Sequence, residues 1–251
     1  MRTDALHRRV VQDLKSVSER VGDILPPKMP KRHEGRSYNL SAFLRRMNER
    51  TESLGVFHER HDDIAMPEHT LVVSGLWLPK VELPENGSRA DIRLLWHVHP
   101  NTKRILMSRN VWDRRRFYFW QRLAHELVHR HQDARREDDS EARTYAVRTE
   151  HRDRKSQQLY YGNYDELEAY AHDAAMEFIT WMPDLSFGAA VRAVDALPHS
   201  YVVVPAWTDF LSAFDETHPA TAAFKRKTKA WWDTMRATPA IYEQLRLPKL
   251  I

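Results

Sequence analysis

The fold prediction starts from residues 125–129, His-Glu-Leu-Val-His, which have the form HExxH. They lie within residues 111–132, where the sequence pattern is typical of a helix. On a helix, His125 and His129 share one face and can bind one tetrahedral Zn²⁺. Glu126 lies about 100° around the helix, placed to reach a water on the metal rather than the metal itself. This arrangement is what a metal-dependent hydrolase needs, although an amphipathic helix with solvated or hydrogen-bonded histidines has the same pattern.

The composition indicates a globular protein that can bury a sizeable core. The chain has 251 residues, which suits one large domain or one domain with an appendage. It contains no cysteine, which excludes disulfides and thiolate metal ligands and fits a reducing compartment. No apolar run is long enough for a membrane span, and the first residues do not resemble a signal peptide. We therefore expect a cytoplasmic protein without a membrane partner, in a bacterium or, if the protein is viral, in its host.

The charge is unevenly distributed along the chain. Lys and Arg total 39 and Asp and Glu total 35, which gives a net charge of +4. Basic residues are in excess in residues 28–50 and again in residues 103–116. Such patches can bind nucleic acid or acidic protein, but they more often form solvated surface. Nucleic acid is therefore a possible partner that the sequence does not favour over a protein substrate.

The N-terminal part of the chain is expected to be helical. Apolar residues at helical spacing predict a helix over residues 6–21. A basic, proline-rich linker follows in residues 26–37, and a second helix is predicted over residues 41–54. Residues 1–55 then form either a separate appendage or helices packed on the main domain, which we place at residues 56–251.

Strands are expected between these helices and the HExxH motif. The β-rich runs are residues 70–78, 91–99 and 104–108. His97 and His99 fall on the same face of the second strand and could in principle bind metal, but a surface pair is the simpler interpretation. We predict an α+β fold: a mainly helical zincin-like domain with a small antiparallel sheet packed on the HExxH helix.

Helices predominate after the motif. Residues 132–158 are dense in charges of both signs and are expected to form a solvated helix or loop excursion. Further helices are predicted over residues 164–182, 185–196, 206–215 and 219–236. In the first of these, an apolar stripe is expected in the core; it comprises Leu167, Ala171, Ala174, Phe178 and Trp181. Aromatic residues of the later helices are expected to be core anchors; they are Trp207, Phe210, Phe214, Phe224, Trp231 and Trp232.

A catalytic zinc site needs a third protein ligand. His131 lies about 200° from His129 on the same helix and is excluded. Glu168 is the first choice, because small alanines beside it allow a second helix to approach the HExxH helix closely. An ordinary surface glutamate is the alternative interpretation. The remaining candidates, in order, are Glu150, His172 and Glu166.

The motif and the helix after it resemble a known family. His-Glu-Leu-Val-His at 125–129 and Glu-Leu-Glu-Ala-Tyr-Ala-His-Asp-Ala-Ala at 166–175 resemble the zincin metallopeptidases, especially the ImmA/IrrE-like type. The pair is also similar to small HExxH proteins of bacteriophages. The resemblance covers about residues 117–180, with a longer and more charged segment between the motifs. It implies zinc ligands at His125, His129 and Glu168, with Glu126 as the base.

The expected function is therefore a zinc-dependent metallopeptidase that hydrolyses peptide bonds in a protein substrate. Its oxyanion would need a hydrogen-bond donor. The candidates for this role, or for an outer-shell contact, are Tyr160, Tyr161, Tyr170 and His172. Two alternatives stay open: an interaction or structural protein on a zincin scaffold with little or no turnover, possibly viral in origin, and a DNA-associated protease.

Overall fold

The computed structural model describes eleven segments of the chain: residues 3–21, 31, 37–39, 57–61, 69–74, 91–96, 98–99, 104–106, 109–136, 154–197 and 204–237. The chain divides into two compact units. One comprises residues 1–13, 124–244 and 249–251, and the other comprises residues 14–123 and 245–248. The boundary expected near residue 55 stays a prediction. The helix expected over residues 41–54 lies outside the described residues.

Within the described residues, six short strands belong to the second unit. They are β1 (Ser37–Asn39), β2 (Phe57–His61), β3 (His69–Ser74), β4 (Asp91–Trp96), β5 (Val98–His99) and β6 (Arg104–Leu106). All pairings are antiparallel, in the orders β2-β3-β4 and β1-β6-β5. The stretch expected as one strand over residues 91–99 is thus divided between two sheets.

The expected α+β class, with a small antiparallel sheet packed on the HExxH helix, is corrected to a mainly helical fold. The residues whose side-chain burial is described lie in helices and in the turns between them, and none of them is in a strand. The β-rich runs form strands of at most six residues, and they fall in the compact unit that does not contain the HExxH motif.

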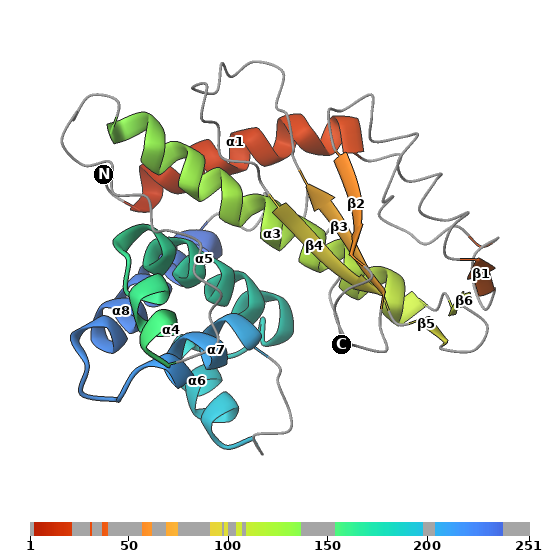
Figure 1. Ribbon diagram of the computed structural model, residues 1–251. Helices are drawn as coiled ribbons and strands as arrows, with labels where there is room; N and C mark the ends of the chain where they lie inside the picture. The colour runs from red at the N-terminus through yellow and green to blue at the C-terminus, as the bar shows by residue number, and fades with distance from the viewer. Residues whose placement is uncertain are drawn as a thin grey trace. The chain divides into compact units, whose positions relative to one another are not determined.

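The first unit contains the motif and is built from helices (Figure 1). It includes parts of α1 (Thr3–Val21) and α3 (Arg109–Arg136), and all of α4 (Arg154–Tyr161), α5 (Tyr164–Trp181), α6 (Phe187–Asp195), α7 (Pro205–Ala213) and α8 (Pro219–Ala237). The helices predicted at the places of α1, α3, α5, α6, α7 and α8 are confirmed within a few residues. Helix α4 begins inside residues 132–158, for which a solvated helix or a loop excursion was expected. None of the helices in the described segments has the length and apolar character needed to cross a bilayer.

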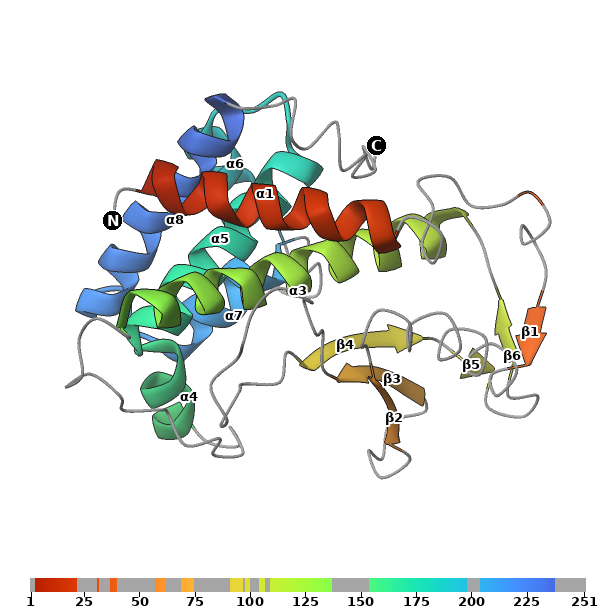
Figure 2. The ribbon, with the colours of Figure 1, turned by 90° about the horizontal axis from the view of Figure 1, so that it is seen from above.

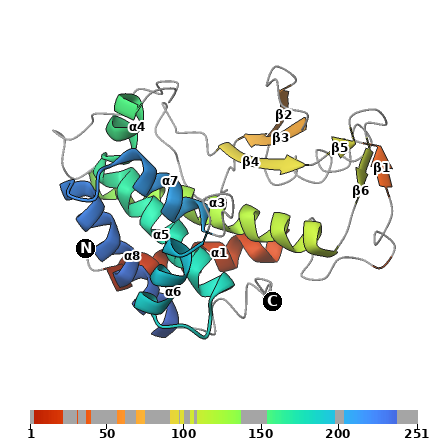
Figure 3. The same cartoon turned by 90° about the horizontal axis from the view of Figure 1, so that it is seen from below.

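Helix α5 is central because α8, α7 and α4 all pack against it (Figures 2 and 3). The expected stripe is confirmed: Leu167, Ala171, Ala174 and Phe178 are buried, and Trp181 is half-buried. The side chain of Asn163 caps the helix by accepting a hydrogen bond from the Asp165 N–H at 3.0 Å. The helix ends at Trp181, two residues before Pro183.

The aromatic residues expected as core anchors are buried. The rings of Phe210 and Phe224 stack with centroids 3.8 Å apart, and the rings of Phe178 and Trp207 meet edge to face at 5.2 Å. Buried Glu177 accepts a hydrogen bond from the Ala206 N–H at 2.9 Å, which satisfies a free amide at the start of α7. These contacts fix the positions of α7 and α8 against α5.

The turn between α4 and α5 requires glycine at position 162. A Cβ built on Gly162 would lie 2.5 Å from the carbonyl oxygen of Gln158, which already accepts the Gly162 N–H at 2.9 Å. Gly162→Ala is therefore expected to destabilise the protein by about 1–3 kcal/mol, because the added methyl group clashes with the Gln158 carbonyl oxygen. Chemical denaturation measures this change.

Gly188→Ala in α6 is the matched control for this prediction. A Cβ at Gly188 meets only the Arg192 Nη1 atom at 3.6 Å, which is ordinary van der Waals contact. In a helix, this substitution is expected to stabilise by about 0.5–1 kcal/mol. Equal effects of the two substitutions would contradict the steric account.

Candidate metal centre

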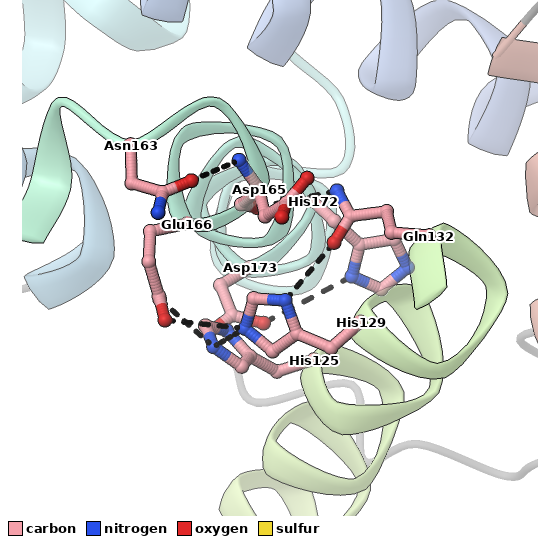
Figure 4. Close-up of polar contacts among 8 residues, drawn as sticks. All are labelled: His125, His129, Gln132, Asn163, Asp165, Glu166, His172 and Asp173. Atoms are coloured by element: carbon pink, nitrogen blue, oxygen red, sulfur yellow. Dashed lines mark hydrogen bonds and ion pairs between the residues drawn. The ribbon is translucent and has the colours of Figure 1, made fainter. Parts of the chain in front are cut away.

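The HExxH motif lies on α3 and faces the first turn of α5 (Figure 4). The Nε2 atoms of His125 and His129 are 3.2 Å apart. Glu166 Oε2 lies 3.6 Å from the Nε2 of His125, and Glu166 Oε1 lies 3.5 Å from the Nε2 of His129. Two imidazole nitrogens and one carboxylate therefore converge on a single point.

The second nitrogen of each imidazole is held by an oxygen. The Nδ1 of His125 lies 3.0 Å from Asp173 Oδ2, and the Nδ1 of His129 lies 3.0 Å from Gln132 Oε1. Gln132 Nε2 donates to the Asp165 carbonyl at 3.3 Å, which assigns the oxygen of this amide to His129. Both Nδ1 atoms must then carry protons, so in the neutral rings both Nε2 lone pairs point at each other and at Glu166.

Such a cluster of acceptors requires a positive charge between its members. Burial lowers the pKa of His125, but Asp173 and Glu166 outweigh this effect and raise the pKa to about 10. Burial likewise raises the pKa of Glu166, but the neighbouring imidazoles of His125 and His129 outweigh this effect and lower the pKa below its ordinary value.

The three side chains fit a metal ion. Tetrahedral ligands about 2.0–2.1 Å from zinc lie about 3.3 Å from one another. The two Nε2 atoms are 3.2 Å apart, and each lies 3.5–3.6 Å from a different oxygen of Glu166, so the group is compact enough to surround one ion. Glu166 Oε2 is buried without a hydrogen-bond partner, so one oxygen remains available for a ligand bond. His125, His129 and Glu166 can thus hold a metal ion, and this is the only such group among the described residues.

The third carboxylate is Glu166, which corrects the expectation of Glu168. Glu168 is buried on the opposite side of α5, where its Oε1 accepts a hydrogen bond from Trp231 Nε1 at 2.9 Å. Its Oε2 contacts the ammonium group of Lys227. Glu168 therefore joins α5 to α8 and takes no part in the converging group.

Two residues of the site had no role assigned from the sequence, Asp173 and Gln132. Asp173 is fully buried, seven residues after Glu166 and so two turns along the same face of α5. A charged residue in an alanine-rich buried helix, at that spacing from a glutamate, is the signal that could have identified it. Gln132 follows His129 by three residues and is its neighbour on α3.

Glu126 is half-buried beside the two histidines and is not part of the converging group. Burial raises the pKa of Glu126, and the charges of His125 and His129 oppose this effect only in part. A carboxylate with a raised pKa binds a proton more tightly than an exposed one and is a better general base.

The candidate donors lie on different sides of α5. His172 is buried on the side of α8, where its ring meets Trp231 at 4.8 Å. Its Nδ1 is 3.9 Å from Asp173 Oδ1, so its link to the site passes through that residue. Burial lowers the pKa of His172 and favours the neutral ring.

The three candidate tyrosines are close to the converging group. Tyr170 meets the His125 ring edge to face at 5.1 Å, and Tyr161 and Tyr160 meet Tyr170 at 4.9 and 6.2 Å. His131 points away, as expected, and bonds Asp13 of α1 at 2.9 Å. The candidate ligand Glu150 lies outside the described residues, as does His97.

Comparison with known proteins adds no relative: no family model, no curated protein and no solved structure matches the chain. The function of the centre has therefore to be inferred from the geometry of His125, His129 and Glu166 and from the residues around them.

Proposed function

We propose that the protein is a zinc-dependent metallopeptidase. The observation that supports this most is the convergence of two Nε2 lone pairs and an unbonded carboxylate oxygen directly beside Glu126. The similarity of residues 117–180 to ImmA/IrrE-like zincins supports the same reaction, with Glu166 in place of Glu168 as third ligand.

Zinc suits this set of donors best. Two histidines and one glutamate are a known catalytic zinc set, and three protein ligands leave a fourth position open for water or substrate. When bound, zinc lowers the pKa of a coordinated water and polarises the scissile carbonyl. Asp173 and Gln132 fix the imidazole tautomers, so that both Nε2 atoms are free to bind the ion.

The protein's own residues supply the proton transfers. Glu126 takes the proton of the attacking water and returns it to the leaving amine, which a carboxylate with a raised pKa can do. A developing oxyanion needs a hydrogen-bond donor. Tyr170, whose ring meets that of His125 at 5.1 Å, is the phenol best placed for this role.

Metal removal tests the proposal. Purified protein loaded with one equivalent of zinc is expected to cut an unstructured protein substrate, as measured by new N-termini in mass spectrometry. A chelator should abolish the cutting and added zinc should restore it. Zinc binding without cutting would favour the interaction or structural scaffold, and failure to bind zinc after reconstitution would overturn the proposal.

A further inference from the structure

One buried amide joins the two helices that carry the proposed ligands (Figure 4). Gln132 lies on α3, three residues after His129, and its side chain is buried. Its Oε1 is 3.0 Å from the Nδ1 of His129, and its Nε2 donates to the Asp165 carbonyl at 3.3 Å. Asp165 directly precedes Glu166 in the first turn of α5. A single side chain therefore contacts one ligand on α3 and the backbone beside another ligand on α5.

The orientation of this amide follows from its partners. A backbone carbonyl oxygen only accepts hydrogen bonds, so the NH₂ group of Gln132 faces Asp165 and its oxygen faces His129. The Asp165 carbonyl belongs to the planar peptide unit that ends at the Cα of Glu166. A hydrogen bond to that oxygen therefore restrains the backbone from which the Glu166 side chain extends.

Glu166 lies between two links from α5 to α3. Asp173, two turns further along α5, contacts the Nδ1 of His125 at 3.0 Å and restrains the middle of the helix. The Gln132 link restrains its first turn, where the Asn163 side chain also accepts from the Asp165 N–H at 3.0 Å. The turn that carries the third ligand is thus held from both sides of one residue.

We propose that Gln132 is a positioning residue of the metal centre, whose amide sets the separation between the Nε2 of His129 and the carboxylate of Glu166. This role goes beyond holding the His129 ring, because it acts through the amide nitrogen and the α5 backbone. The inference rests on the proposed metal site.

The test compares two substitutions at position 132. Gln132→Glu keeps an oxygen for His129, but it removes the NH₂ group and places an oxygen against the Asp165 carbonyl. Gln132→Met keeps the length of the side chain and removes both contacts. Each variant is expected to bind zinc about 10–100-fold more weakly than the unaltered protein, as measured by competition with a chromophoric chelator.

Gln132→Glu separates the two roles of the amide. A carboxylate is a common partner for the second nitrogen of a zinc-binding histidine. If the oxygen on His129 were the whole role of Gln132, this variant would bind zinc at least as tightly as the unaltered protein.

Gln158→Glu is the matched control. Gln158 Nε2 donates to the Ala213 carbonyl at 2.9 Å, so this amide also joins two helices, α4 and α7, through a backbone oxygen. The same substitution there removes the same kind of contact outside the converging group. Gln158→Glu is expected to bind zinc as the unaltered protein does, and circular dichroism checks the helicity of all three variants.

Cobalt in place of zinc supplies a readout of geometry. The visible absorption of Co²⁺ changes with the number and arrangement of its ligands. The spectrum is expected to change in both variants of Gln132, because Glu166 then meets the ion from a different position, and to stay unchanged in Gln158→Glu. A variant that had lost only stability would keep the spectrum of the unaltered protein.

Each outcome bears on the inference. Unchanged zinc affinity and cobalt spectrum in Gln132→Met would overturn it, and this result decides the matter even if Gln132→Glu does not fold. Normal binding by Gln132→Glu beside weak binding by Gln132→Met would also overturn it, because the contact with His129 would then suffice. An equal loss in Gln158→Glu would assign the effect to helix packing.

The proposed function fails in a different way. Failure of the unaltered protein to bind zinc or cobalt would overturn the metal site and, with it, the role of Gln132. Zinc binding without peptide cleavage would overturn the peptidase and leave the role of Gln132 in place.

Discussion

Glu166→Ala is expected to remove the bound metal, whereas Glu168→Ala is expected to keep it. Glu166 is the only carboxylate that converges with the two Nε2 atoms among the described residues. Its removal leaves two ligands, and the affinity should fall by more than the roughly 10–100-fold that loss of an outer-shell partner causes. Metal analysis after dialysis, together with chelator competition, measures the difference.

The two variants are matched because the same change is made two residues apart on one helix. Glu168→Ala has its own expected effect, which is a loss of stability. Its carboxylate accepts from Trp231 and pairs with Lys227, so its removal should destabilise by about 1.5–3 kcal/mol. The Lys227 side chain is 25% exposed and can be hydrated again, which places the loss at the lower end.

The reverse pattern of metal loss would restore the assignment made from the sequence. A folded Glu168→Ala protein without zinc, beside a Glu166→Ala protein that retains it, would mean that α5 presents its other face to the motif. Loss of zinc from both variants with intact helicity would point to a general effect of α5 on the site.

The ambiguity between Glu166 and Glu168 has a simple geometric cause. The apolar stripe that contains Leu167 shows which side of α5 is buried, and the two glutamates lie about 100° to either side of it. Both glutamates are therefore at the edge of the core, and the helical periodicity does not show which of them faces the histidines. Only the packing of α5 against its neighbours decides that Glu166 faces the histidines and Glu168 faces α8.

The helices could be predicted from local periodicity, but local periodicity could not identify the third ligand. A stripe such as Leu167, Ala171, Ala174 and Phe178 is local, and it identifies the helix and its buried side without any knowledge of the partner. Strand pairing depends on distant segments. Residues 91–99 alternate without a break in the sequence, yet they divide into β4 and β5 of different sheets.

The HExxH spacing, in contrast, predicted both the helix and the position of the two histidines on one of its faces. His125 and His129 must meet if α3 is a helix, and they do. The roles of Asp173 and Gln132 could be assigned only from the structure, because a residue that orients a metal-binding histidine is recognised by its contact with that histidine. In the sequence, neither residue differs from any other aspartate or glutamine; only the contact with an imidazole Nδ1 shows its role.

Glu126→Gln is expected to lower hydrolysis by about 10²–10⁴-fold while zinc stays bound. Glutamine keeps the shape of the side chain but cannot take a proton from water. Zinc should remain because Glu126 is outside the converging group of three. The rate of peptide cleavage, measured at equal zinc occupancy, separates this effect from loss of metal.

His129→Ala supplies the comparison for that variant. His129 contributes one of the two converging Nε2 atoms, so its loss should remove zinc and activity together. Glu126→Gln should remove activity alone, and the contrast between the two separates a base from a ligand. If Glu126→Gln protein keeps its fold but loses zinc, Glu126 is a ligand; if it keeps both zinc and full activity, another residue is the base. Because burial raises the pKa of Glu126, and the two neighbouring histidines oppose this only in part, this carboxylate is suited to accept the proton.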